Sequence, residues 1–250
     1  MSTSKFAAAF ALSAFATVAT AAPVEVFYSN FDGALAAEIA PGSATQTSVQ
    51  GYVGLGPAGN QFSGNFLRSA TGNTVTLSLI GLPAHDTISL EFLFAAIDSL
   101  DGTGTFPSGD FFKIVFDGAT LFSESFANAD PSQIQSYVPP AGVELARHDN
   151  LGFSGPGGYY TDSAYNLGAD PRFANFAHTG STATIEFFIF GPGNQSLDDE
   201  SWAMDNLRVS VTTRGATVPE PASVVLLGIG LVEAQEAGAP AIREAQAVQV

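Results

Sequence analysis

FFKIVFDGATLFSESF, residues Phe111–Phe126, is the stretch that decides the fold. Two runs rich in Phe, Ile, Val and Thr flank the dipeptide Asp117-Gly118. Asp-Gly is favoured in two-residue hairpin turns because a type I′ turn needs positive φ at both central residues. The stretch therefore predicts two antiparallel strands joined by a tight turn.

Runs of the same kind recur along most of the chain and are separated by Gly, Asp, Asn and Pro, which is typical of strands between turns. In Thr74–Ile80, apolar and hydroxyl side chains mostly alternate, the pattern of a half-buried strand. The other strands expected are Val24–Tyr28, Phe62–Arg68, Asp86–Ala95, Asp110–Phe116, Ala119–Phe126, Thr182–Phe190 and Trp202–Thr212. Eight strands without intervening helices predict an all-β fold, an antiparallel two-sheet jelly-roll sandwich of concanavalin A-like or galactose-binding-like type.

One stretch of this domain, Ala127–His178, does not fit the strand pattern. It is rich in Pro and Gly, which disfavour continuous strands. We expect one long irregular loop there, with a short helix around Gly142–His148. A loop of that length in a compact domain is usually functional or is ordered by something bound.

The amino-acid composition excludes some classes of function. The formal net charge is −16, and Lys5 and Lys113 are the two lysines, which excludes nucleic-acid binding because that needs cations to neutralise phosphates. The chain has no cysteine, so neither disulfides nor thiol catalysis is available. An acidic surface of this kind suits divalent cations.

The N-terminal residues 1–22 have the order of a secretory signal peptide. Lys5 precedes the apolar run Phe6–Ala19, and small residues follow up to Ala22. We expect export by the Sec machinery, cleavage by signal peptidase, and a mature β-sandwich domain over residues 23–213.

The C-terminal residues form three short segments. Residues 214–221 are a linker that ends in Val218, Pro219, Glu220 and Pro221; the apolar segment 222–232 follows, and an Ala-, Glu- and Gln-rich tail, disordered or weakly helical, occupies 233–250. Two prolines make the linker stiff and non-helical.

Val-Pro-Glu-Pro before an apolar run resembles the PEP-CTERM sorting signal of exported proteins from Gram-negative bacteria that make extracellular polysaccharide. The resemblance implies processing by an exosortase and a location outside the cell or on its surface. The apolar segment, however, has 11 residues, too few to span a bilayer as a helix, and no cluster of arginines follows it. Release of the protein rather than anchoring is therefore the alternative.

A second resemblance lies in Asp198–Val209, which looks like the last strand of extracellular lectin-like and carbohydrate-binding jelly rolls. That resemblance implies a structural Ca²⁺ held by Asp205 and by Asp32 near the first strand. Oxygen ligands of this type are those that Ca²⁺ prefers. The alternative is that Asp205 and Asn206 only cap the end of a strand.

A second candidate cation site is a Gly-rich connection that follows an expected strand. It places Asp98, Asp101 and Asp110 close together in sequence, without EF-hand spacing. Carboxylates crowded together repel one another unless a cation or solvent separates them. The segment predicts either a loose Ca²⁺ loop or a solvated turn.

Three tyrosines of the long loop, Tyr159, Tyr160 and Tyr165, are the candidate carbohydrate-binding residues. Exposed aromatic rings can stack on sugar rings. The alternative is that these rings pack inward and pin the loop to the sandwich.

Catalytic motifs are missing from the sequence. Ser154 does not lie in a G-x-S-x-G elbow, and the three histidines do not have zinc-site spacing. The sequence therefore predicts a non-enzymatic surface or matrix protein, with stabilisation by Ca²⁺ and binding of extracellular polysaccharide as hypotheses. A purely structural or adhesive biofilm protein is the alternative, and a glycoside hydrolase is the third class.

Overall fold

The computed structural model describes residues 22–213, except 104–108, 129–131 and 154–159. The expected signal peptide up to residue 21, the linker, the Val218–Pro221 motif, the apolar segment and the tail lie outside the described residues. Within the described ranges, none of the helices is long and apolar enough to cross a membrane.

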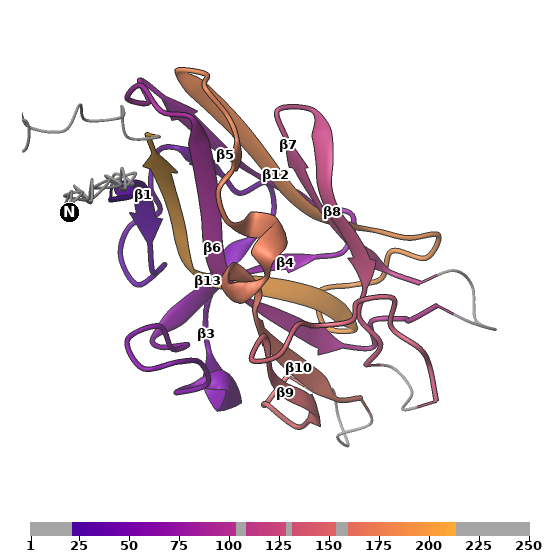
Figure 1. Cartoon of the computed structure of the whole chain (residues 1–250). Helices are drawn as coiled ribbons and strands as arrows, with labels where there is room; N and C mark the ends of the chain where they lie inside the picture. The colour runs from indigo at the N-terminus through magenta and orange to yellow at the C-terminus, as the bar shows by residue number, and fades with distance from the viewer. Residues whose placement is uncertain (1–21, 104–108, 129–131, 154–159, 214–250) are drawn as a thin grey trace, which may run out of the picture. The chain divides into compact units, whose positions relative to one another are not determined.

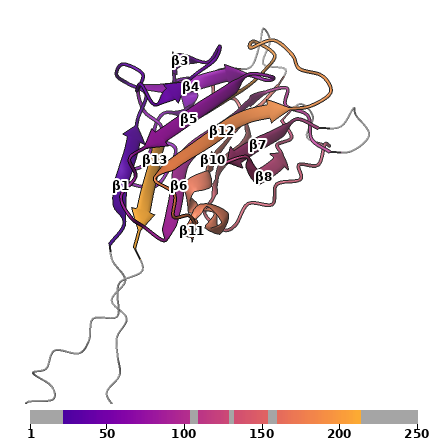
Figure 2. The same ribbon diagram turned by 90° about the horizontal axis from the view of Figure 1, so that it is seen from above.

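The described chain folds into two antiparallel sheets that form a sandwich, which confirms the predicted fold class (Figures 1 and 2). The larger, eight-stranded sheet has the order β3 (Thr45–Ser48), β4 (Asn65–Ala70), β13 (Glu200–Thr212), β6 (Thr87–Asp98), β10 (Asp162–Asn166) and β9 (Glu144–Asp149). In the same sheet β1 (Val24–Ser29) pairs with β13, and β11 (Phe176–Ala177) pairs with β6. The smaller, five-stranded sheet has the order β2 (Ile39–Ala40), β5 (Thr74–Ile80), β12 (Thr182–Phe190), β7 (Phe111–Phe116) and β8 (Ala119–Ser125).

The predicted hairpin is β7–β8. Phe116 pairs with Ala119 across the turn. Asp117 and Gly118 have φ angles of 47° and 79°, so both central residues take the positive φ that the Asp-Gly dipeptide predicted. The alternation in β5 is also confirmed, since Val75, Leu77 and Leu79 are buried.

The main core fills the space between the sheets and is rich in aromatic rings. Trp202 of β13 lies 5.2 Å, ring centroid to centroid, from Phe112 of β7 and 6.5 Å from Phe94 of β6. All three side chains are fully buried. Burial of these large rings supplies the stability that a chain without disulfides needs.

A second apolar cluster covers the other face of the larger sheet. It centres on Tyr52, which belongs to the 3₁₀ helix η1 (Gln50–Tyr52), and contains Phe62, Phe66 and Phe153. The middle strands β6 and β13 are therefore buried on both faces, which explains why Phe92–Ile97 is continuously apolar rather than alternating.

The structure corrects the expectation for Ala127–His178. The helix predicted around Gly142–His148 is wrong, because Glu144–Asp149 forms β9. The segment also contributes β10, β11 and the 3₁₀ helices η2 (Leu167–Ala169) and η3 (Pro171–Phe173). β10 completes its hydrogen bonds on the long strand β6, and β9 on β10, a partnership that local sequence does not encode.

Candidate metal centre

Three carboxylates converge at one end of the sandwich: Asp101, Asp110 and Glu200. Asp101 follows β6, Asp110 immediately precedes β7, and Glu200 is the first residue of β13. One potential ligand oxygen from each residue lies within 4.8 Å of those from the other two. Glu200 is 0% exposed and Asp110 3%, so the cluster is buried on the side of these two residues.

Backbone and amide groups fix two of the carboxylates. The Asp101 backbone N–H donates to Asp110 Oδ2 at 2.7 Å, and the Asp110 backbone N–H donates to the carbonyl of Asp101 at 2.9 Å. Gln133 Nε2 donates to Asp101 Oδ1 at 2.9 Å. These bonds hold the two aspartates together although they are not neighbours in the chain.

Glu200 is held by one oxygen only. Gln195 Nε2 donates to its Oε1 at 2.6 Å. Its Oε2 is buried and accepts no hydrogen bond from any of the described residues, whereas a protonated Glu200 can donate one to the Asp110 carboxylate. A buried carboxylate oxygen without a partner is costly, so a proton or a cation is needed there.

The electrostatics of the cluster favour neutralisation. Burial, followed by the negative charge of Asp110, raises the pKa of Glu200 to about 8. Burial also raises the pKa of Asp110 to about 6, and the charge of Asp101 adds to that shift. Both shifts arise because charge is being removed from water close to like charge.

Three carboxylates without nitrogen or sulfur ligands form a donor set for a hard cation. Ca²⁺ takes six to eight oxygens, and three carboxylates offer up to six. The negative charge that raises both pKa values is the charge that a divalent ion would neutralise. The cluster could therefore hold a metal ion.

The structure brings together two of the three aspartates predicted for a cation loop. Asp101 and Asp110 come together, but Asp98 does not join them. Asp98 has φ 60°, and its buried carboxylate lies 4.0 Å from the guanidinium of Arg68. Glu200 was not among the predicted ligands. It belongs to an acidic run just before the last expected strand, and that position could have indicated a metal ligand. It pairs directly with Asp98 across β13 and β6.

The other predicted calcium pair, Asp32 and Asp205, has a different environment. All four carboxylate oxygens accept hydrogen bonds, from Asn30 Nδ2 and from the backbone amides of Asn65, Ser63 and Asn206. Burial raises the pKa of Asp205 to about 7. These hydrogen bonds are the ones expected of two side chains that cap backbone turns. A Ca²⁺ ion at this pair stays a prediction.

The three tyrosines do not form one exposed platform. Tyr165 is 0% exposed, and its hydroxyl donates to Gln135 Oε1 at 3.2 Å inside the core. The prediction of a stacking role for Tyr165 is wrong for that reason, and the alternative of an inward-packed ring holds. Tyr160 is partly buried, and Tyr159 lies outside the described residues.

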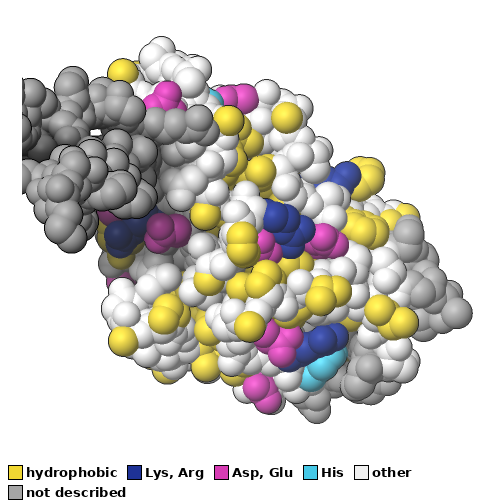
Figure 3. Space-filling view, viewed as in Figure 1, with side chains coloured by type: hydrophobic (Ala, Val, Ile, Leu, Met, Phe, Trp, Pro, Cys, Tyr) yellow, Lys and Arg dark blue, Asp and Glu magenta, His cyan; other side chains and the backbone are white. Residues whose placement is uncertain are grey.

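The face of the molecule in Figure 3 carries mixed charges rather than one dominant charged patch. Hydrophobic side chains are scattered among neutral ones, and basic groups lie mostly beside acidic ones. Two ion pairs fit this picture, Arg172 with Glu124 at 3.0 Å and Arg208 with Glu25 at 3.3 Å.

The fold and the cluster define an all-β, two-sheet sandwich with an acidic site that could hold a metal ion. No protein-family model matches the chain, and no curated protein matches its sequence. Several solved structures match about three quarters of the chain, each with low sequence identity and a TM-score below 0.5.

A cycloisomaltooligosaccharide glucanotransferase of Paenibacillus sp., complexed with cycloisomaltoheptaose, matches over 76% of this chain and 18% of its own, with 16% identity and a TM-score of 0.34. The 4-O-methyl-α-glucuronidase BtGH115A matches over 76% of this chain and 18% of its own, with 12% identity and a TM-score of 0.31. The extracellular domain of ANXUR1 from Arabidopsis thaliana matches over 73% and 42%, with 13% identity and a TM-score of 0.27. The chain therefore spans less than half of the length of each of these proteins.

Proposed function

We propose that this chain is an exported, non-catalytic surface or matrix protein of a Gram-negative bacterium, stabilised by Ca²⁺ and binding extracellular polysaccharide. Sec export, signal peptidase cleavage and exosortase processing belong to the same proposal and rest on the two ends of the sequence. The observation that carries the calcium part is the buried, unpartnered Oε2 of Glu200 beside Asp110 and Asp101.

The burial of the cluster supports a structural rather than a catalytic role. A glycosidase places two carboxylates about 5–10 Å apart on either side of a substrate cleft. One carboxylate oxygen of Asp110 lies within 4.8 Å of one carboxylate oxygen of Glu200, and both side chains are almost completely buried. Their burial favours a structural ion over a pair of catalytic carboxylates.

Thermal unfolding of the purified protein in excess Ca²⁺ and in a chelator tests the calcium part. Trp202, the single tryptophan, lies two residues from Glu200 and is buried, so its fluorescence reports unfolding. At a Ca²⁺ concentration of 100 times Kd, binding adds about 2.7 kcal/mol to the free energy of unfolding. We expect the midpoint to rise with Ca²⁺ and to return with the chelator.

Two variants make the test specific to the cluster. Glu200→Gln keeps the size of the side chain and an oxygen for Gln195, but it removes the charge, so its response to Ca²⁺ is expected to be lost. Glu38→Gln removes a charge from an exposed position and should respond as the wild type does. An unchanged wild-type midpoint in Ca²⁺ and chelator would overturn the calcium part.

A further inference from the structure

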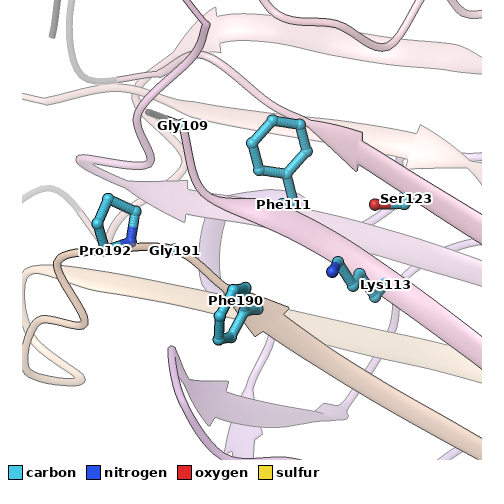
Figure 4. Close-up of a pocket in the computed structure, with 7 residues that line it drawn as sticks. All are labelled: Gly109, Phe111, Lys113, Ser123, Phe190, Gly191 and Pro192. Atoms are coloured by element: carbon cyan, nitrogen blue, oxygen red, sulfur yellow. The ribbon is translucent and has the colours of Figure 1, made fainter. Parts of the chain in front are cut away.

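A pocket of about 320 Å³ opens on the outer face of the smaller sheet. Phe111 and Lys113 of β7 line it together with Ser123 of β8 and Phe190, the last residue of β12. Figure 4 shows these side chains together with the Gly191-Pro192 turn that follows β12. They all come from outward-facing positions, since the alternate residues of these strands are buried in the core.

Aromatic rings give the pocket a flat, apolar surface. Phe190 is 61% exposed and pairs across the strands with Phe111. The next outward residue of β12, Phe188, pairs with Lys113. A ligand that covers exposed rings of this size removes apolar area from water, which favours its binding.

Lys113 is the positive charge of the pocket. Its Nζ lies 5.0 Å from the centroid of the Phe190 ring. Among the described residues, Lys113 has no carboxylate within 4.0 Å, whereas Arg68, Arg172 and Arg208 are all in ion pairs. It is the single lysine of residues 23–250 in a chain of net charge −16. Its ammonium group is therefore available to an anionic ligand, and charge complementarity favours one.

Hydroxyl groups continue the surface away from the pocket. The outward residues of β5 and β12 beside the aromatic end include Thr74, Thr76, Ser78, Thr182 and Thr184, and also Glu186, which lies opposite Thr76. Thr184 pairs with Ser78, and Phe188 pairs with Thr74, so the hydroxyl groups lead toward the aromatic end. The aromatic rings and the ammonium group of Lys113 at the end of this surface match a sugar that carries a carboxylate there.

We propose that this pocket binds an acidic, uronic-acid-type sugar residue of an extracellular polysaccharide. The sugar carboxylate pairs with Lys113 Nζ, and the apolar face of the sugar ring stacks on Phe190 or Phe111. The inference deepens the proposed carbohydrate binding, on which it rests, by naming the site and the sugar class. An acidic peptide is the competing ligand, since Ser123 lies on the edge strand β8, and the test below includes one.

The pocket shares its wall with the candidate metal centre. Gly109 and Gly191 line the pocket, and Asp110 is the next residue after Gly109. A Cβ on Gly191 would lie 2.6 Å from Asp110 Oδ1, so the Gly191 turn packs directly on the cluster. A cation that fixes Asp110 would therefore also fix this side of the pocket.

The test compares an oligogalacturonate with its fully methyl-esterified form, two ligands of one backbone that differ in charge, by titration calorimetry on the purified protein. We expect the acidic form to bind at least about tenfold more tightly than the ester, since a charge-assisted hydrogen bond is lost with the ester. Lys113→Met should abolish that difference, and Phe190→Ala should weaken binding of both forms. Ile80→Ala, at an exposed position on the opposite end of the same face, is the matched control and should bind as the wild type does.

The outcomes separate the two proposals. Binding of both forms with equal affinity, unchanged in Lys113→Met, would overturn the acidic-sugar pocket and leave carbohydrate binding standing. Binding of poly-glutamate as tightly as of the oligogalacturonate would overturn the sugar class. No binding to these ligands or to a panel of neutral glycans would overturn both the pocket and the proposed carbohydrate binding. Circular dichroism of each variant shows whether it is folded.

Discussion

Asp32 and Asp205, from opposite ends of the described chain, hold the same turn. Asp32 Oδ1 accepts the backbone N–H of Asn65 at 2.7 Å, and Asp205 Oδ2 accepts that of Ser63 at 3.2 Å. Gly64 lies between the two amides with φ 56°. At Asp205 the pairing of β13 with β6 is irregular. On its other edge, β13 pairs with β4 before Asp205 and with β1 after it. The two carboxylates therefore join three strands of the larger sheet.

Gly64→Ala is expected to destabilise the protein, by about 2 kcal/mol, because a Cβ at Gly64 meets the Asp32 carboxylate and because positive φ is strained for alanine. Denaturant unfolding measures the loss. Gly59→Ala is the control, since Gly59 has φ 83° but a Cβ added there would have no atom within 4 Å. Equal losses in the two variants would mean that strain alone matters and that the Asp32 contact does not.

Arg68→Met is expected to cost about 3 kcal/mol or more, because it leaves the buried carboxylate of Asp98 beside an apolar side chain. The side chains of Arg68 and Asp98 are 10% and 1% exposed. Arg68 also donates to the carbonyl of Leu197 at 2.7 Å, and its guanidinium lies 4.7 Å from the ring of Phe153.

The matched control is Arg208→Met. Arg208 pairs with Glu25, but these side chains are 44% and 47% exposed, and solvent screens such a pair. Chemical denaturation of the control should shift the free energy of unfolding by no more than about 1 kcal/mol. A loss as large as that of Arg68→Met would contradict the role assigned to burial.

Stability without Ca²⁺ is expected to fall as the pH rises from about 4.5 through about 8. The pKa of Glu200 is about 8 in the folded protein and 4.5 for an ordinary glutamate. The folded state therefore binds the proton more tightly than the unfolded state, and its advantage is lost as the pH passes the folded pKa. Urea unfolding at several pH values, in chelator and in Ca²⁺, measures the effect.

Ca²⁺ should remove most of this pH dependence, because the ion replaces the proton on the cluster. The stabilisation by Ca²⁺ should accordingly be small at a pH near the ordinary glutamate pKa and large at a pH near 8, the folded pKa of Glu200. Asp205, with a pKa raised to about 7, contributes a pH dependence of comparable size that Ca²⁺ at the cluster leaves in place. Stabilisation by Ca²⁺ that is equal at both pH values would count against an ion on Glu200 and Asp110.

Asp32→Asn separates the two acidic sites. It is expected to lower stability by about 1 kcal/mol, through weaker hydrogen bonds to the Asn65 turn, and to keep the full response of the melting midpoint to Ca²⁺. Asp110→Asn should instead lose that response. If Asp32→Asn loses it and Asp110→Asn keeps it, the calcium ion occupies the Asp32–Asp205 pair that the jelly-roll resemblance implied.

Local sequence was sufficient for features that depend on neighbours in the chain. The Asp117-Gly118 turn follows from the φ preferences of two residues, and the alternation of Thr74–Ile80 follows from the period of a strand. β5 and β12 have the predicted bounds, Thr74–Ile80 and Thr182–Phe190. The helix expected around Gly142–His148 is wrong because β9 gains its hydrogen bonds from β10, a partner that lies further along the chain.

For the acidic sites, too, some features follow from local sequence and others only from the tertiary structure. The sequence by itself determined a Cys-free, acidic β-sandwich and indicated Asp101 and Asp110, because carboxylates in one Gly-rich connection are visible as neighbours. Only the tertiary structure decided that Glu200 completes the cluster, that Asp98 turns to Arg68, and that Tyr165 is buried. The physical reason is strand pairing: the register of β13 on β6 brings Glu200 to the end of β6, and no local preference specifies that register.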